Sequence, residues 1–114
     1  MLKKTVLELG GSDPYVVVAD AEIDSSVKAC VTSRMVNNGQ SCMAGKRFIV
    51  DKSVVNEFRE TFVELMNLKT CGDLNDELTE LGPQVRMYLL GELHGHVINS
   101  IKRGATLLLG GKVT

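Results

Sequence analysis

Residues 15–50 read YVVVADAEIDSSVKACVTSRMVNNGQSCMAGKRFIV and decide the fold. The stretch begins and ends with short apolar runs, residues 15–18 and 48–50, which are continuous and β-branched rather than alternating. Such runs are typical of strands covered on both faces in a parallel sheet. Between them, apolar residues recur at three- and four-residue spacing: Ile23, Val27, Cys30, Val31 and Met35. This period predicts an amphipathic helix from a candidate N-cap at Asp20 to about Val36, with Cys30 in the core.

The rest of the chain continues the alternation of strands and helices. A second helix is expected from Ser53, and a third after Pro83, ended by Gly104. Their apolar faces would contain Val54, Phe58, Phe62 and Leu65, and then Val85, Leu89, Leu93, Val97 and Ile101. Residues 5–9 and 106–109 are predicted as two further strands, and residues 72–82 as a solvated loop. The order predicts an α/β fold with a parallel sheet.

Charge and hydropathy exclude several classes of partner. The 114 residues contain 13 Lys and Arg against 14 Asp and Glu, a formal net charge of −1, so no long-range positive field would attract nucleic acid. Glu8 interrupts the amino-terminal segment where a secretory apolar stretch would continue, and no apolar run has membrane-spanning length. We expect no nucleic acid or membrane partner and a cytoplasmic location.

The three cysteines, Cys30, Cys42 and Cys71, are an odd number without CxxC spacing. This argues against a disulfide framework and suits a reducing compartment. A zinc site with His94 and His96 is disfavoured because, apart from that His-Gly-His step, the ligands occur singly. No metal is expected. Both histidines are predicted near the end of the third helix as surface or capping groups, and Cys71 as a bystander.

Two residues are candidates for chemistry. Cys42 lies in a small, polar segment, residues 37–47, between a helix end and a strand, where a rigid scaffold would present it on a tight loop. Composition alone favours the alternative that Cys42 packs as a small hydrophobe. Glu8 is a carboxylate between Leu7 and Leu9. Taken alone it is an ordinary solvent-facing strand residue, and the functional alternative is a general base.

Residues 7–14, LELGGSDP, are followed, 34 residues after Glu8, by GQSC at residues 39–42. This pair resembles the signature of the aldehyde dehydrogenase superfamily. The resemblance continues through KRFIV, LGP and GATLLLGG at residues 46–50, 81–83 and 104–111, and covers essentially the whole chain. It implies that residues 1–114 are part of the catalytic domain of that α/β fold, with the dinucleotide-binding domain absent.

The resemblance also implies roles. Cys42 would be the nucleophile, its backbone N–H would help to hold the oxyanion, and Glu8 would be the general base. Leu9 and Gly10 would lie nearest the nicotinamide of NAD or NADP. The family's second oxyanion donor, an Asn, and its dinucleotide-binding half lie upstream, and no GxGxxG loop occurs here. The isolated chain is therefore expected neither to bind the cofactor usefully nor to turn over an aldehyde.

Within the family, residues 7–14, 46–50 and 91–94 resemble bacterial succinate-semialdehyde dehydrogenases, which implies a homo-oligomeric parent enzyme. The better known branch has an Arg six residues before its nucleophile, where this chain has Val36. Arg34 would point about 160° away from Val36 on a helix. The substrate is thus expected to be succinate semialdehyde or a broader range of small aldehydes. A rival hypothesis is an inactive truncated remnant or a subunit-interaction module, since Met1 so near the motif fits an engineered cut or a shortened gene.

Overall fold

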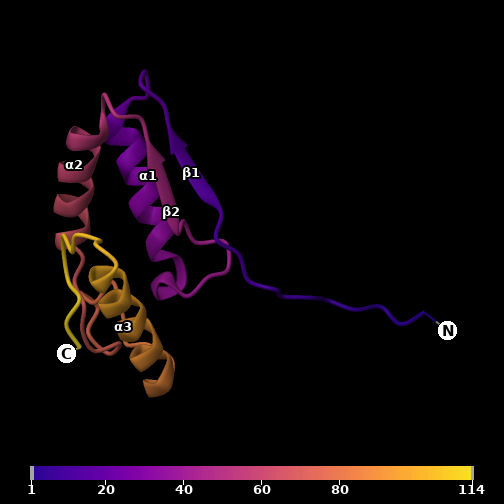
Figure 1. The fold of residues 1–114 in the computed structure, drawn as a ribbon. Helices are drawn as coiled ribbons and strands as arrows, with labels where there is room; N and C mark the ends of the chain where they lie inside the picture. The colour runs from indigo at the N-terminus through magenta and orange to yellow at the C-terminus, as the bar shows by residue number, and fades with distance from the viewer. Residues whose placement is uncertain (1, 114) are drawn as a thin grey trace. The chain divides into compact units, whose positions relative to one another are not determined.

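A computed structural model describes residues 2–113, so Met1 and Thr114 lie outside it. In chain order the elements are β1 (Pro14–Val17), α1 (Ile23–Met35), the 3-10 turn η1 (Val36–Gly39), β2 (Arg47–Val50), α2 (Val55–Asn67) and α3 (Met87–Lys102) (Figure 1). The chain divides between Phe62 and Val63 into two compact units. The predicted α/β class is confirmed by this combination of a parallel sheet with helices.

The first unit is built on a parallel pair of strands. β1 pairs with β2 in a register that sets Pro14 opposite Arg47 and Val17 opposite Val50. The backbone N–H of Asp51 donates to the carbonyl of Val17 over 2.9 Å, which extends the pairing beyond β2. A parallel pair needs a crossover connection, and α1 supplies it. The predicted parallel pairing of these two runs is therefore confirmed.

The core of this unit lies against one face of the two strands. Val17 is buried there, together with the predicted apolar face of α1, namely Ile23, Val27, Cys30 and Val31. The other face is open, because Val16 is 65% exposed and Ile49 52%. The prediction that both faces of these strands are covered is therefore wrong for the described residues. Successive side chains of a strand point to opposite faces, so with one face covered, less exposed and more exposed residues alternate along each strand.

Aromatic side chains join the sheet to α2. The ring of Phe48 lies 5.8 Å from that of Tyr15, 6.4 Å from Phe58 and 5.1 Å from Phe62, centroid to centroid. These separations are in the range of favourable aromatic contacts, each worth about 0.5–1.5 kcal/mol beyond the area buried. Phe48 thereby fixes the start of β2 to both neighbouring strand and following helix.

The two additional predicted strands are not formed. Residues 5–9 and 106–109 have no strand assignment, and their leucines are exposed, with Leu7 at 69% and Leu107 at 47%. A strand needs a neighbour whose backbone completes its hydrogen bonds. Within residues 2–113 no segment pairs with either run, so a β-branched, apolar composition is not enough to form a strand.

The first residues of the helices also differ from prediction. For α1 and α2 the difference follows from hydrogen bonds that nearby side chains make to the backbone. The N-cap of α1 is Glu22 rather than Asp20, and its carboxylate accepts from the backbone N–H groups of Asp24 and Ser25. The Asp51 carboxylate accepts from both the backbone and the hydroxyl of Ser53, forming a turn that delays α2. The third helix begins only at Met87.

The second unit contains the predicted loop and α3. A single parallel bridge pairs Cys71 with Leu81, and Lys69 and Glu80 form an ion pair of 2.6 Å beside it. The intervening residues are exposed turns, as predicted. His94 and His96 lie in the middle of α3, so their predicted place near the end of the helix is wrong. No helix within residues 2–113 is long and apolar enough to cross a membrane.

The cap of α1 makes a testable contribution to stability. Hydrogen bonds from Ser25 hold the pKa of the Glu22 carboxyl below its ordinary value of 4.5. A lowered folded-state pKa means that the carboxylate stabilises the fold above about pH 4.5, and that this stabilisation is lost as pH falls through the lower value. Glu22→Gln should therefore lower the thermal unfolding midpoint at pH 7 and leave it nearly unchanged at pH 2. Glu57→Gln, in the first turn of α2, is the control. An equal fall in the unfolding midpoint at pH 7 and at pH 2 would contradict a stabilising role of the ionised Glu22 carboxylate as the cap.

Candidate active site

The parallel register brings two distant segments to one edge of the sheet. Residues before β1 and residues before β2 both lie at the amino ends of their strands, since paired parallel strands start together. The side chain of Arg47 donates from Nε to the carbonyl of Ser12 over 2.9 Å. A Cβ atom placed on Gly11 would lie 3.6 Å from the carbonyl oxygen of Cys42. The two motif segments, 34 residues apart in sequence, therefore meet.

Cys42 lies on the loop between η1 and β2, and it is exposed. Its alternative role as a small buried hydrophobe is therefore wrong. The next three backbone N–H groups are used inside the protein: that of Met43 donates to Ser41 Oγ, that of Ala44 to the Ser41 carbonyl, and that of Gly45 to Ser33 Oγ. The N–H of Cys42 donates to no acceptor in the described part of the chain. It is therefore an unused donor within residues 2–113.

A lysine lies on the same loop. The ammonium of Lys46 donates to the carbonyl of Cys42 over 2.6 Å and to that of Ser41 over 3.3 Å. These bonds engage carbonyl groups of the loop and do not involve the N–H of Cys42. They also place a positive charge beside the residue that carries the thiol.

Glu8, Leu9 and Gly10 lie on the extended segment before Gly11, and all three are exposed. Glu8 makes no hydrogen bond within residues 2–113. Three extended residues span about 11 Å, so the Glu8 backbone lies within that distance of Gly11. The structure thus places Gly11 beside the Cys42 loop, whereas the segment before it leads away from the strands (Figure 1), and it does not bring the Glu8 carboxylate to that loop.

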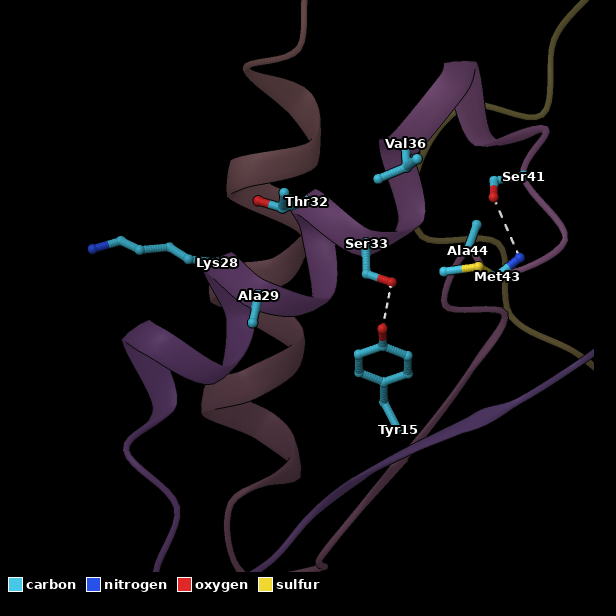
Figure 2. A pocket seen from close by; sticks show the side chains of 9 residues that line it. All are labelled: Tyr15, Lys28, Ala29, Thr32, Ser33, Val36, Ser41, Met43 and Ala44. Atoms are coloured by element: carbon cyan, nitrogen blue, oxygen red, sulfur yellow. Dashed lines mark hydrogen bonds between the residues drawn. The ribbon is translucent and has the colours of Figure 1, made fainter.

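A pocket of about 480 Å³ opens beside the loop (Figure 2). Its walls come from β1, α1, η1 and the loop, and the lining residues are Tyr15, Lys28, Ala29, Thr32, Ser33, Val36, Ser41, Met43 and Ala44. Ser41 and Met43 are the two chain neighbours of Cys42. The nucleophile candidate is therefore attached to the rim of a recess large enough for a small organic molecule.

The other two cysteines were predicted as a core residue, Cys30, and a bystander, Cys71. Cys30 is buried in the face of α1, and burial raises the pKa of its thiol. Cys71 is exposed in the second unit. Among residues 2–113 no three His, Cys, Asp or Glu side chains gather as a metal site would require.

Sequence reasoning missed the polar residues that hold the loop. The guanidinium of Arg34 donates to the carbonyls of Gly39 and Gly45, and the hydroxyls of Tyr15 and Ser33 lie 2.6 Å apart. From the sequence, the helical period indicates only that Arg34 points away from Val36. The one available signal was its position, a cation in the last turn of a helix that leads into a glycine-bounded loop.

Together, these features define an α/β protein that presents a cysteine on a braced loop at the amino edge of a parallel sheet. The model of the aldehyde dehydrogenase family matches residues 1–114, and the chain belongs to that family.

Similar proteins with known names support this assignment. The chain is 48% identical over 111 residues to the succinate semialdehyde dehydrogenase [NAD(P)+] Sad of Escherichia coli strain K12, covering 97% of this chain and 24% of that protein. It is 46% identical to a succinate-semialdehyde dehydrogenase [NADP(+)] of Mycobacterium avium, with the same coverage. The chain thus spans about a quarter of the length of these relatives.

Solved structures agree. A succinate-semialdehyde dehydrogenase from Burkholderia pseudomallei superposes with a TM-score of 0.92 at 32% identity, over 97% of this chain and 23% of that one. A 3,6-anhydro-L-galactose dehydrogenase in complex with NAP superposes with a TM-score of 0.88 at 34% identity, over 92% of this chain and 22% of that one.

The geometry predicts an order of thiol reactivity. Cys42 should be alkylated before Cys30 and Cys71 by limiting iodoacetamide, because it is exposed on a fixed loop beside a pocket whereas Cys30 is buried. Peptide mapping by mass spectrometry reads out the order, and Cys42→Ser is the control that should leave only slow labelling. Faster labelling of Cys30 or Cys71 would contradict the assignment and favour an inert interaction module.

Proposed function

We propose that this chain is the cysteine-bearing part of an NAD(P)-dependent aldehyde dehydrogenase acting on succinate semialdehyde or a similar small aldehyde. The observation that carries the proposal is the combination at Cys42 of an exposed thiol, an unused backbone N–H and an adjoining pocket. Membership of the aldehyde dehydrogenase family, and relatives named succinate-semialdehyde dehydrogenases, support it.

Cys42 is the nucleophile in this proposal. Its thiolate attacks the aldehyde carbon, and the carbonyl oxygen becomes an anion. The free N–H of Cys42 donates to that oxygen, in keeping with the general use of fixed donors where charge develops. Loss of hydride from the same carbon then converts the adduct to a thioester on Cys42.

Glu8 is the general base of the second half of the reaction. Its carboxylate takes a proton from water as the water oxygen attacks the thioester carbon. The carbon–sulfur bond breaks, the carboxylic acid leaves, and the Cys42 thiolate is restored. Since Glu8 lies on an exposed, extended segment, it is accessible to water in the arrangement described here.

The cofactor would meet this chain at Leu9 and Gly10. Gly10 has a positive φ of 75°, and no atom lies within 4 Å of the place where a Cβ would stand, so a flat ring could approach its backbone. Bound NAD(P) would accept the hydride there. The amino end of α1 does not suit its pyrophosphate, because the Glu22 carboxylate occupies that end and repels phosphate.

The pocket suits a small aldehyde, but its lining does not select for a carboxylate at the far end of the substrate. Val36 stands in its wall, and Arg34 is engaged with the loop carbonyls, so neither offers a free cation to a substrate carboxylate. Lys28 is the cation among the lining residues, and Figure 2 shows its ammonium turned away from Tyr15 and Met43. A range of aldehydes broader than succinate semialdehyde is consistent with these walls.

The division of labour between Cys42 and Glu8 can be tested in an enzyme of full length that contains this chain. Glu8→Gln should slow thioester hydrolysis more than hydride transfer, because the base is needed when water attacks. Stopped-flow absorbance should then show a burst of NAD(P)H followed by a slow steady state. Glu57→Gln, an exposed carboxylate on α2, is the matched control. A normal steady-state rate in Glu8→Gln with no accumulated acyl-enzyme would rule out Glu8 as the base.

A further inference from the structure

One side chain ties both ends of the loop that carries Cys42. Arg34, in the last turn of α1, donates from Nη1 to the carbonyl of Gly45 over 3.0 Å and from Nη2 to the carbonyl of Gly39. Gly39 precedes Cys42 by three residues and Gly45 follows it by three. A planar guanidinium suits this two-pronged contact, because its N–H groups point outward in a fixed fork.

Gly45 is held from a second side as well. Its N–H donates to Ser33 Oγ over 3.0 Å, and the Tyr15 hydroxyl lies 2.6 Å from the same Ser33 oxygen (Figure 2). A Cβ on Gly45 would lie 3.0 Å from the Phe48 ring, so a larger residue there would require the ring to shift. Both backbone groups of Gly45 are therefore bonded to consecutive residues of α1.

The segment before Cys42 needs such support. Asn37, Asn38 and Gly39 have φ values of 52°, 56° and 72°, three successive residues in the left-handed region. That conformation costs non-glycine residues free energy and persists only where the surroundings impose it. The bond from Arg34 to the Gly39 carbonyl holds the end of this run.

The Arg34 guanidinium holds the Cys42 loop at a residue on each side of the cysteine. The N–H of Ala44 closes a turn within the loop on the Ser41 carbonyl, the N–H of Gly45 bonds to Ser33 of α1, and Arg34 bonds to the carbonyls of Gly39 and Gly45. These bonds restrict the backbone on both sides of Cys42. Release of the ends would let Cys42 and its N–H sample many directions while the thiol stayed exposed.

We propose that Arg34 is a positioning residue for the nucleophile, holding the Cys42 loop through its two-carbonyl fork. The proposal rests on the proposed role of Cys42. It assigns Arg34 to the loop and not to the substrate carboxylate, although Arg34 lies only two residues before Val36.

The test uses the 114-residue chain with Arg34→Ala, Arg34→Lys and the control Arg59→Ala, whose parent side chain bonds to Asn56 of the same helix. Amide hydrogen exchange at Ala44 and Gly45 reports the loop, and exchange at Asp51 reports the strand pairing. Arg34→Ala should raise exchange at Ala44 and Gly45 about tenfold or more, as expected for a local opening, and leave Asp51 unchanged. Arg34→Lys should recover only part of the protection at Ala44 and Gly45, because an ammonium group lacks the two-pronged geometry of the guanidinium.

Reactivity supplies a readout that a purely structural role would not move. The ratio of alkylation rates of Cys42 and Cys71 in the same molecule should fall toward one in Arg34→Ala, and millimolar guanidinium should restore it where equal sodium chloride does not. An unchanged ratio, or full recovery by Arg34→Lys, would overturn the proposal. If Cys42 is no faster than Cys71 in the parent chain, the proposed function fails instead, and hydrogen exchange alone decides whether Arg34 holds the loop.

Discussion

The parallel register of β1 and β2 is the constraint on which the rest of the first unit depends. It starts both strands at one edge, so the segments that precede them must meet there, as Gly11 and Cys42 do. In open α/β sheets, ligands usually bind beyond the carboxyl ends of the strands. Here the candidate site lies at the amino ends, because the chemistry-bearing residues come before the strands and not after them.

Local patterns predicted what depends on local physics. The 3.6-residue period of α1 identified its buried face, including Cys30, because every residue of that face packs on the same side. The runs at residues 5–9 and 106–109 failed because a strand exists only with a partner, and composition says nothing about the partner. The start of α1 was misplaced for a similar reason: Glu22 outcompetes Asp20 through hydrogen bonds made only once the first turn has formed.

The residues of the candidate site also fall into those that the sequence predicted and those that it did not. Cys42 and Glu8 were found because their motif residues are adjacent in sequence, and the loop position of Cys42 is confirmed, while their roles remain predictions. Arg34 and Ser33 were not found because their partners, Gly39 and Gly45, become neighbours only when the chain turns back through three left-handed residues. A sequence pattern contains the glycines of such a turn but not the side chain that closes it.

The central claim is that the Cys42 sulfur carries the acyl group during aldehyde oxidation, and direct capture of that group tests it. An enzyme of full length that contains this chain would be mixed with aldehyde and NAD(P), quenched in acid, and digested for mass spectrometry of its cysteine peptides. We expect an acyl mass on the peptide of Cys42 and none on those of Cys30 or Cys71. Turnover with no acyl group on Cys42, or an acyl group on another residue, would contradict it.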